Sequence, residues 1–367
     1  MTEPITYAGA GVDTEAGDKA VELMKSAVSR THGPEVLGGV GAFAGLFDAS
    51  ALKAYDRPLL ASSTDGVGTK IVIARALDVH DTIGQDLVAM VVDDIVVCGA
   101  KPLVMTDYIA CGRVVPERIA DIVRGIAEGC EMAGVALVGG ETAEHPGVME
   151  PDDYDVAGAA VGVVEASEVL GAERVREGDV VVAMASSGLH SNGYSLVRRV
   201  VSHAGWQLDT SLPELGRTVG EELLEPTRIY SQLCVALAAS VPGLRAFSHV
   251  TGGGLGANVA RVLPKGLAAT VSRDAWDLPA VFSVVQAAGS VPWNDLESTL
   301  NMGVGMVAVV APEDAEGLMA TSRAAGVEAW TLGEIVADDG RTTSPDTIRG
   351  AKGVDGGAVY LSGAYRA

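Results

Sequence analysis

A short apolar segment that leads into a glycine- and acid-containing stretch constrains this chain more than any other feature. Residues 57–61 have the composition of a short strand, and Ser62-Ser63-Thr64-Asp65-Gly66-Val67-Gly68-Thr69-Lys70 follows them. Glycines where a strand ends let backbone N–H groups approach phosphate oxygens, while Asp65 can hold a divalent cation and Lys70 can supply positive charge. The stretch predicts a polyphosphate site, with an ordinary Asp-Gly turn as the alternative. Its candidate ligand contacts are Asp65, Gly66, Gly68, Thr69 and Lys70.

The next segment, residues 81–99, has the pattern of a helix that begins at Asp81 and ends before Gly99. At the helical period, Asp94 falls in the middle of the strongest apolar row, where a core residue is expected. Burial of an unpaired carboxylate costs several kcal/mol, so Asp94 needs a cation, a metal ion or dense hydrogen bonding. We therefore expect Asp94 to be buried and to share Mg²⁺ with Asp65. An ion pair with Lys or Arg is the structural alternative.

The same design recurs later in the first half of the chain. Residues 102–110 form an apolar strand pattern with one acid inside it, Asp107. Residues 135–138 are a short strand pattern that opens into Gly139-Gly140-Glu141-Thr142, where glycines again precede an acid. These segments add Asp107, Gly140, Glu141 and Thr142 to the candidate site.

The residues before position 52 are rich in glycine and resemble an arm, apart from a short helix predicted over residues 16–30. The run of residues 37–45, which contains Gly39 and Gly41, has too many glycines for regular structure. Its backbone either closes over a ligand or serves as a flexible hinge. Lys25, near the end of the predicted helix, either neutralises phosphate charge or is solvated.

In the second half, a strand pattern at residues 179–185 leads into a polar stretch before a helix that starts near Tyr194. Hydroxyls, an amide and backbone N–H groups at a helix N-terminus suit a phosphate or carboxamide ligand. This makes Ser191, Asn192 and Gly193 candidate substrate contacts. His190 is either a proton carrier or a structural residue of the turn.

A second glycine turn precedes a later helix, in the stretch Thr251-Gly252-Gly253-Gly254. Thr251, Gly253 and Gly254 there offer N–H groups to an anion. Both halves thus share a plan of strand, glycine turn and helix, and the polar interval 166–178 separates them. The sequence contains neither a Gly-x-x-x-x-Gly-Lys-Ser/Thr loop nor a dinucleotide fingerprint with a ribose-binding acid at the right distance.

Composition restricts the class of protein. The 367 residues suffice for two domains, and a net charge of −22 disfavours nucleic acid and anionic membranes as partners. The mean hydropathy of +0.28 suggests a buried subunit interface and hence a homo-oligomer. No apolar run reaches the roughly 18 residues of a membrane span, and the N-terminus lacks the basic start of a secretion signal, so we expect a cytoplasmic protein. The four cysteines are scattered and predict reduced thiols rather than a metal site.

Five motifs in this order resemble the phosphoribosylformylglycinamidine cyclo-ligase (AIR synthetase) family over residues 7–336. They are Ser63-Thr64-Asp65-Gly66-Val67-Gly68-Thr69-Lys70, Asp86-Leu87-Val88-Ala89-Met90, Gly139-Gly140-Glu141-Thr142-Ala143-Glu144, His190-Ser191-Asn192-Gly193-Tyr194-Ser195 and His249-Val250-Thr251-Gly252-Gly253-Gly254-Leu255. The opening Ala10-Gly11-Val12-Asp13 and residues 34–48 also resemble this family and separate it from thiamin-monophosphate kinase and selenophosphate synthetase. Asp93, His145 and Leu300 depart from the family, which commonly has Asn, Met and Phe there.

The resemblance implies a two-domain α/β (α+β) protein that dimerises through the sheet of its N-terminal domain. The implied domains are residues 1–52 as a glycine-rich arm, 53–166 as the N-terminal domain with ATP, Mg²⁺ and the dimer interface, 167–345 as the C-terminal domain and 346–367 as a peripheral tail. It implies ATP-dependent closure of the imidazole ring of aminoimidazole ribonucleotide, with the glycine arm covering the nucleotide. Whether a monovalent cation is also needed stays open.

On this resemblance, Asp65, Asp94 and Glu141 are expected to hold Mg²⁺, and Gly253 and Gly254 to cradle phosphate. Ser191 and Asn192 would bind the ribotide or amidine end of the substrate, and His190 would carry a proton. An amide oxygen is a poor leaving group, so ring closure requires ATP to phosphorylate it. For such a phosphoryl transfer, the protein is needed mainly to position the substrates and to neutralise phosphate charge.

Two other interpretations remain open at this point. One keeps the fold but makes the chain a synthetase or kinase for another small phosphate-bearing or selenium substrate. A selenium enzyme is disfavoured because it would carry a reactive Cys or selenocysteine near its N-terminus, whereas the first Cys here is Cys98. The other is a nucleotide-binding scaffold without catalysis, in which the acids serve only stability.

Overall fold

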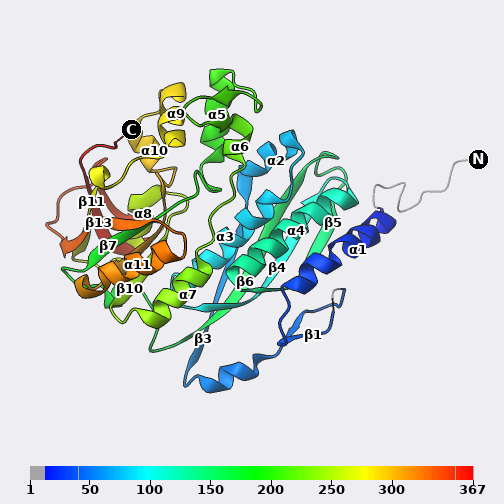
Figure 1. The fold of residues 1–367 in the computed structure, drawn as a ribbon, viewed down its shortest axis with the longest axis horizontal. Coiled ribbons are helices and arrows are strands. Elements are labelled where there is room, and N and C mark those ends of the chain that lie inside the picture. Colours follow the sequence, from blue (N-terminus) through cyan, green and yellow to red (C-terminus); the bar gives the residue numbers. More distant parts are fainter. Residues whose placement is uncertain (1–12, 40, 352, 367) are drawn as a thin grey trace, which may run out of the picture. The chain divides into compact units, whose positions relative to one another are not determined.

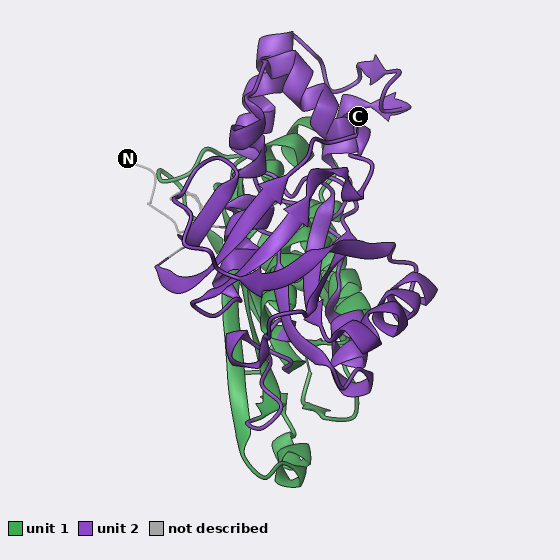
Figure 2. Cartoon of the chain, turned by 90° about the vertical axis from the view of Figure 1, so that its left-hand side faces the viewer, with its two compact units in different colours: residues 1–95, 101–165 green, residues 96–100, 166–367 purple. Residues whose placement is uncertain are grey.

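The computed structural model describes residues 13–39, 41–351 and 353–366. They form two compact units, each with its own sheet (Figure 2). Unit 1 is Met1–Ile95 with Lys101–Glu165, and unit 2 is Val96–Ala100 with Ala166–Ala367. The expected two-domain fold of mixed helices and strands is confirmed. The motif residues Ala10, Gly11 and Val12 lie outside the described residues.

Unit 1 is built on a four-stranded sheet in the order β3-β6-β4-β5. The strands are β3 (Pro58–Gly66), β6 (Tyr154–Glu165), β4 (Lys101–Cys111) and β5 (Ala136–Glu144). Only the β4–β5 pair is parallel. β3 and β5 are longer than predicted, so Asp65 and Gly140 lie inside strands rather than in the turns that follow them.

Helices cover one face of this sheet (Figure 1). Those of unit 1 are α1 (Thr14–Arg30), α2 (Ile71–Leu77), α3 (Thr82–Val96) and α4 (Pro116–Ala133). Smaller elements are β1 (Val36–Leu37), β2 (Leu46–Phe47) and the 3-10 helices η2 (Ala49–Ala54) and η3 (Gly68–Lys70). α3 and α4 pack closely because glycines stand at the crossing: a Cβ on Gly125 would lie 1.7 Å from the carbonyl oxygen of Asp81. α1 packs against the outer side of α4.

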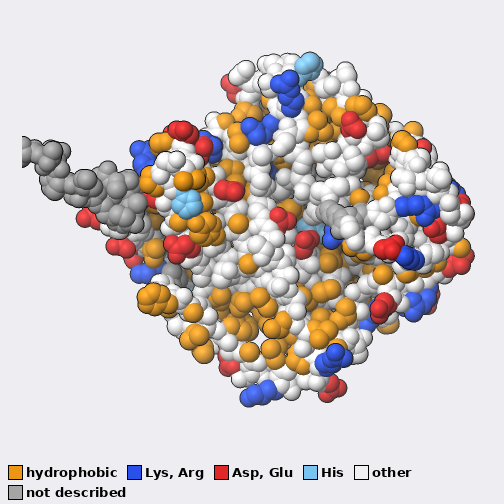
Figure 3. All heavy atoms as spheres, turned by 180° about the vertical axis from the view of Figure 1, so that it is seen from behind, with side chains coloured by type: hydrophobic (Ala, Val, Ile, Leu, Met, Phe, Trp, Pro, Cys, Tyr) orange, Lys and Arg blue, Asp and Glu red, His pale blue; other side chains and the backbone are white. Residues whose placement is uncertain are grey.

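The opposite face of the four-stranded sheet carries small and apolar side chains that no helix of unit 1 covers. Strand alternation and register place Leu60, Val104, Tyr108, Ala159 and Val161 on it. Leu60 is 66% exposed and Tyr108 is 41% exposed. Figure 3 shows hydrophobic side chains gathered over the lower part of the molecule, where β3, β6 and β4 lie in Figure 1.

Unit 2 is built on a seven-stranded sheet in the order β10-β12-β7-β13-β11-β15-β14. Its strands are β7 (Val180–Ala185), β10 (Leu244–His249), β11 (Leu267–Ser272), β12 (Val304–Val310), β13 (Ala329–Ala337), β14 (Thr347–Ala351) and β15 (Val354–Ser362), with a separate β8 (Ser211–Leu212) and β9 (Arg217–Thr218) pair. β15 pairs in parallel with β11, and the other neighbours are antiparallel. Residues 346–367, expected to be a peripheral tail, therefore supply two strands of this sheet.

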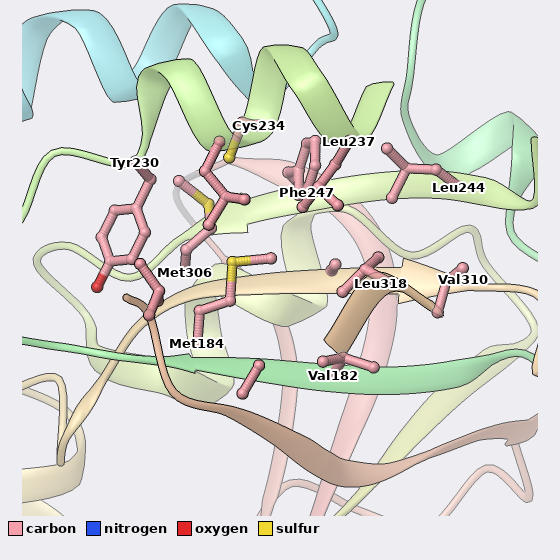
Figure 4. Packing of buried hydrophobic residues seen from close by; sticks show 14 of the residues in the cluster. Val182, Met184, Tyr230, Cys234, Leu237, Leu244, Phe247, Met306, Val310 and Leu318 are labelled. Carbon is pink, nitrogen blue, oxygen red and sulfur yellow. The ribbon is translucent and has the colours of Figure 1, made fainter. Parts of the chain in front are cut away.

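Two of the unit 2 helices pack on one face of this sheet and form an apolar core with it (Figure 4). α7 brings Cys234 and Leu237 and α11 brings Leu318 against strand residues such as Val182 and Phe247. The helices of unit 2 are α5 (Tyr194–Ala204), α6 (Val219–Leu223), α7 (Ser231–Ser240), α8 (Gly254–Arg261), α9 (Ala280–Gly289), α10 (Trp293–Glu297) and α11 (Ala315–Ala324), with the 3-10 helices η4 (Ala172–Arg174), η5 (Arg273–Ala275) and η6 (Pro312–Asp314). α8 packs against β14 and β15.

None of the helices in the described ranges has the length and apolar character that a membrane crossing requires.

Candidate functional site

Three predicted site residues of unit 1 lie in one row across the four-stranded sheet. Asp65 of β3 and Asp107 of β4 both pair with Gly158 of β6, and Asp107 also pairs with Gly140 of β5. Residues in register point to the same face of a sheet, and neighbouring strands lie about 4.8 Å apart. Asp107 and Gly140 are therefore adjacent, whereas Asp65 and Asp107 are about 10 Å apart.

Asp107 is a buried carboxylic acid, only 9% exposed. Burial removes the carboxylate from water, which raises the pKa of Asp107 from 3.8 to about 7. Gly140 makes room for the acid, because a Cβ at position 140 would lie 2.4 Å from Asp107 Oδ1 and 3.0 Å from Oδ2. A side chain at position 140 and the present orientation of Asp107 are therefore mutually exclusive.

Asp107 and Gly140 line a cavity of about 250 Å³ within unit 1. Its walls come from α1, α4, β5 and the glycine run of the arm. Among the predicted site residues, the cavity brings together Gly39, Gly41, Asp107, Gly140, Glu141 and Thr142. The apolar part of its lining includes Ala20, Met24, Val28, Val123 and Leu137. The cavity thus combines an apolar interior with the Asp107 carboxyl group and several glycines, the usual make-up of a small-molecule site.

The arm is held along the edge of β5, where it closes this cavity. Gly45 lies so close to β5 that a Cβ on it would be 2.3 Å from the carbonyl oxygen of Val138. After α1, the backbone N–H of Leu137 donates to Thr31 Oγ1 at 3.0 Å, and the ring of His32 hydrogen-bonds the Leu137 carbonyl oxygen at 2.7 Å. These contacts fix both ends of the segment that carries Gly39 and Gly41.

Lys70 does not offer its charge to a ligand in this structure. Its side chain is fully buried, and its Nζ donates to Asp86 Oδ1 at 2.8 Å, with both side chains 0% exposed. Removal of one partner of such a pair costs about 3–5 kcal/mol, because the other charge stays buried. Lys70 thus anchors the end of the glycine stretch to α3, which corrects the expectation that it neutralises phosphate.

Asp94 also differs from its expected position: it is exposed, and the neighbouring Asp93 is the fully buried acid. α3 is apolar on most sides, so the helical period could not choose between the two. Ile95, the residue after Asp94, packs against Gly162 of β6. Gly162 pairs with Ala61 of β3, and Ala61 lies four residues before Asp65. At about 3.3 Å per residue, Asp94 is thus displaced roughly 13 Å along the strand direction from Asp65.

The three carboxylates expected to hold Mg²⁺ therefore do not converge on one position. Asp65, Asp94 and Glu141 are all exposed, and Glu141 lies three strands away from Asp65. In the described part of the chain, no group of three or more His, Cys, Asp or Glu side chains could hold a metal ion. Mg²⁺ in nucleotide sites commonly takes one or two carboxylates and completes its coordination with phosphate oxygens and water. Asp107 fits this mode as a single carboxylate, because it faces the cavity on the helix-covered side of the sheet. Glu141 also lines the cavity, but it pairs with Tyr108 and so belongs to the opposite face of the sheet.

Lys25 lies outside the cavity, although its neighbours Met24 and Val28 line it. Its Nζ pairs with Glu22 at 2.9 Å, and the Lys25 side chain is 50% exposed. The structure thus favours the solvated alternative for Lys25. Gly66, Gly68 and Thr69 follow Asp65 near the carboxyl end of β3 and do not line the cavity.

In unit 2, the loop between β7 and α5 is held in a fixed shape by hydrogen bonds. Asn301 Nδ2 donates to the Gly188 carbonyl oxygen at 2.9 Å, and Asn301 Oδ1 accepts from Ser186 Oγ at 3.2 Å. Ser191 is buried, and its hydroxyl hydrogen-bonds Thr227 at 3.1 Å. Asn192 and Gly193 are half-buried, as are Ser186 and Ser187 at the start of the loop.

His190 is part of the framework of this loop. It is 2% exposed and adopts a positive φ of 63°. The backbone N–H of Ser187 donates to His190 Nε2 at 3.1 Å, so this nitrogen is the acceptor of a hydrogen bond within the loop. These contacts favour the structural alternative for His190 over the expected proton shuttle.

The two glycine turns of unit 2 lie next to each other. A Cβ on Gly252 would be 3.2 Å from Asn192 Oδ1. Asn258 of α8 stabilises the turn by donating from Nδ2 to the carbonyl oxygens of Thr251 and Gly254, at 3.1 and 2.8 Å. Asn192, Gly193 and the turn Thr251–Gly253 therefore form one half-buried polar surface within unit 2.

Several residues of these surroundings carried no predicted role. Asp86 stands in one of the five motifs, which is the signal that could have marked it. Both Asp86 and Asn301 are buried polar residues with hydrogen-bond partners in the structure. Thr227 is also a buried polar residue, and nothing in the sequence marked it because it meets Ser191 only through the fold.

Comparison with solved structures shows the fold. The thiamine-monophosphate kinase of Stenotrophomonas maltophilia K279a superposes with a TM-score of 0.66 at 18% identity and covers 93% of this chain and 96% of its own. The hydrogenase maturation protein HypE, in a structure determined with ATP, has a TM-score of 0.60 at 17% identity and covers 90% of this chain and 89% of its own.

Comparison of sequences shows the family. Residues 47–164 match the N-terminal domain of AIR synthase related proteins, and residues 176–344 match the C-terminal domain. The phosphoribosylformylglycinamidine cyclo-ligase of Desulfitobacterium hafniense (strain DSM 10664 / DCB-2) is 50% identical over 330 residues, which are 90% of this chain and 96% of that protein. The chain therefore belongs to the phosphoribosylformylglycinamidine cyclo-ligase family.

Proposed function

We propose that the chain is itself a phosphoribosylformylglycinamidine cyclo-ligase. It would close the imidazole ring of formylglycinamidine ribonucleotide and release 5-aminoimidazole ribonucleotide, ADP and phosphate in purine biosynthesis. The single observation that carries this proposal is the 50% identity to a protein of that name over nearly the full length of both chains. The make-up of the unit 1 cavity supports it independently.

The chemistry requires an activated oxygen. The amide oxygen attacks the γ-phosphorus of ATP, the bond from that phosphorus to the bridging oxygen of ADP breaks, and a phosphate ester forms. The neighbouring nitrogen then attacks the activated carbon, loses a proton, and phosphate leaves with the former amide oxygen. The protein contributes mainly by positioning the two substrates and neutralising charge.

The cavity of unit 1 is the proposed ATP site. Its apolar lining from Met24, Val28 and Leu137 suits the adenine ring, and the glycine run with Gly39 and Gly41 would lie over the nucleotide. Asp107 would hold Mg²⁺, with phosphate oxygens and water as the remaining ligands, and the ion would neutralise triphosphate charge when bound. Gly140 is needed because any side chain there would displace Asp107.

The polar surface of unit 2 is the proposed site for the ribonucleotide. Gly253 is the N-cap of α8, with its backbone in the left-handed region, and the N-terminus of the helix would bind a phosphate. The N–H of Gly254 already donates to the Thr251 carbonyl oxygen at 3.1 Å, so its neighbours in the turn would supply the donors. Asn192 lies beside the same turn and can donate or accept through its amide. The buried Ser191 would act by holding Asn192 in place.

We also propose a homodimer that buries the uncovered sheet face of unit 1. An apolar face of this kind is unusual for a monomer, and two copies related by a twofold axis would cover it with an identical face.

The proposed reaction predicts the fate of one oxygen atom. With formylglycinamidine ribonucleotide labelled with ¹⁸O in its amide, we expect turnover that depends on ATP and releases the label in phosphate. Mass spectrometry of the released phosphate measures this. Turnover with the label in water would reject the phosphorylated intermediate, and absence of turnover would reject the proposed function.

The proposed ATP site predicts that Gly140→Ala weakens ATP binding about tenfold or more, because the added methyl group would displace the Asp107 carboxylate. Gly139→Ala is the matched control, since its Cβ would meet only Thr106 Cγ2 at 3.8 Å. We expect the control to change affinity less than about threefold. Titration calorimetry with Mg²⁺ and ATP checks both variants, and equal affinities would place the nucleotide elsewhere.

Burial of Asp107 predicts a pH dependence of stability in the unliganded protein. Because the pKa of Asp107 in the folded state, about 7, lies above the usual 3.8, the folded state holds this proton more tightly. Stability should therefore fall as the pH rises from about 4 to about 7 and then level off. The rise in pKa corresponds to at most about 4 kcal/mol.

Asp107→Asn keeps the shape of the side chain and removes its ionisation. The difference in unfolding free energy between wild type and Asp107→Asn should thus decrease between about pH 4 and pH 7. Urea unfolding at several pH values measures it, and a difference that does not vary with pH would contradict a buried, titrating Asp107.

The proposed dimer predicts that the wild type sediments with the mass of two chains. Val161→Glu should dissociate the dimer, because the substitution places a charge in the apolar face. Leu23→Glu, at a position of α1 that is 48% exposed and outside this face, should leave the dimer intact. Analytical ultracentrifugation measures all three proteins. A monomeric wild type, or a Val161→Glu dimer, would exclude this interface.

A further inference from the structure

The C-terminal segment, residues 345–366, lies outside the residues that match the AIR synthase related families, which end at residue 344. It nevertheless joins the sheet of unit 2 through β15 and packs on α8, where a Cβ on Gly256 would be 2.9 Å from Ile348 Cδ1. Its side chains also line a cavity of about 270 Å³ whose lining includes Gly253. The segment therefore reaches the glycine turn that precedes α8.

The residues that connect this segment to the turn form a polar cluster around a shielded ion pair, Glu297 with Arg273. Tyr365 donates its hydroxyl to Glu297 Oε1 at 2.8 Å, and Arg273 binds Glu297 at 2.5 and 2.9 Å. The same guanidinium donates to Asp346 Oδ1 at 2.8 Å. The side chains of Glu297 and Arg273 are 9% and 13% exposed. Tyr365 contacts this ion pair from a half-buried position, and Asp346 contacts it from the exposed side. The Tyr365 ring further packs against Trp276 and Trp293.

Glu297 begins the segment that packs against both glycine turns of unit 2, residues 297–300. A Cβ on Gly254 would lie 1.7 Å from the Glu297 carbonyl oxygen. A Cβ on Gly193 would lie 2.4 Å from Leu300 Cδ2 and 3.0 Å from Thr299 Cγ2. A displacement of residues 297–300 would therefore move Gly193 and Gly254 together.

We propose that residues 345–366 are a positioning element for the ribonucleotide: Tyr365 and Asp346, acting through Glu297 and Arg273, hold residues 297–300 against Gly193 and Gly254. The inference rests on the proposed function for its substrate. Tyr365 and Asp346 are positioning residues, because their contacts run through Glu297 and Arg273 and not directly to the two turns. The element would set the affinity for the ribonucleotide while leaving the ATP site of unit 1 unchanged.

Point variants test this better than truncation, because loss of β15 would expose β11. Tyr365→Phe removes the hydroxyl that binds Glu297 and keeps the aromatic packing. Tyr360→Phe is the matched control: it removes a hydroxyl from the same segment that donates to Asp338, away from residues 297–300. Tyr360→Phe also removes the contacts of this hydroxyl with Asp339, so the control loses at least as many hydrogen bonds as Tyr365→Phe, and a general loss of stability would affect it no less.

In steady-state kinetics, we expect Tyr365→Phe to raise KM for formylglycinamidine ribonucleotide about fivefold, with kcat and KM for ATP changed less than twofold. Asp346→Asn should act in the same direction by a smaller factor, because Asp346 is 63% exposed. Tyr360→Phe should match wild type. An unchanged KM for the ribonucleotide in Tyr365→Phe, or an equal rise in KM for ATP, would overturn the inference.

Hydrogen exchange gives a readout that does not depend on activity. Tyr365→Phe, and not Tyr360→Phe, should accelerate exchange of the Leu300 amide, which donates to the Leu296 carbonyl oxygen at 2.7 Å, and of amides in the two glycine turns. Equal exchange in both variants would overturn the inference even if the wild type failed to turn over the ribonucleotide. Failure of the wild type alone would reject only the proposed function.

Discussion

The account depends most on a buried carboxylic acid in a sheet. Asp107 stands on the helix-covered face of unit 1, where a hydrophobic side chain would be more stable, and its carboxyl group fits only because Gly140 on the next strand has no side chain. A position that costs stability and needs a specific neighbour is typical of a functional site. Asp107 lines a cavity that the glycine arm closes, so the residue that costs stability belongs to a candidate ligand site.

Glycines have a second role in unit 2, where they allow backbone segments to approach closely. Gly193 and Gly254 both pack against residues 297–300, which are in turn tied to the C-terminal segment through Glu297 and Arg273. The surface around Asn192 is therefore shaped by parts of the chain that are more than a hundred residues apart. Rigid support of this kind is what positioning of a charged, flexible ribonucleotide requires.

Much of the fold follows from sequence periodicity, because β4, α4 and β7 have clear strand or helix patterns with recognisable ends. The sequence could not show which side of α3 faces the sheet, since apolar residues surround Asp93 and Asp94. It could not show the pairing of Lys70 with Asp86 either, because that contact depends on how η3 meets α3. The C-terminal segment is polar and rich in glycine, and its strand β15 forms because it pairs with β11, nearly ninety residues earlier in the chain.

The central claim is that the cavity lined by Asp107 and Gly140 binds ATP. Amide hydrogen exchange with and without Mg²⁺ and ATP tests it most directly. We predict slower exchange on binding in β5 around residues 139–142 and in the described part of the glycine run from Gly38 to Gly45. Protection confined to other parts of the chain, with these amides unchanged while ATP is bound, would contradict it.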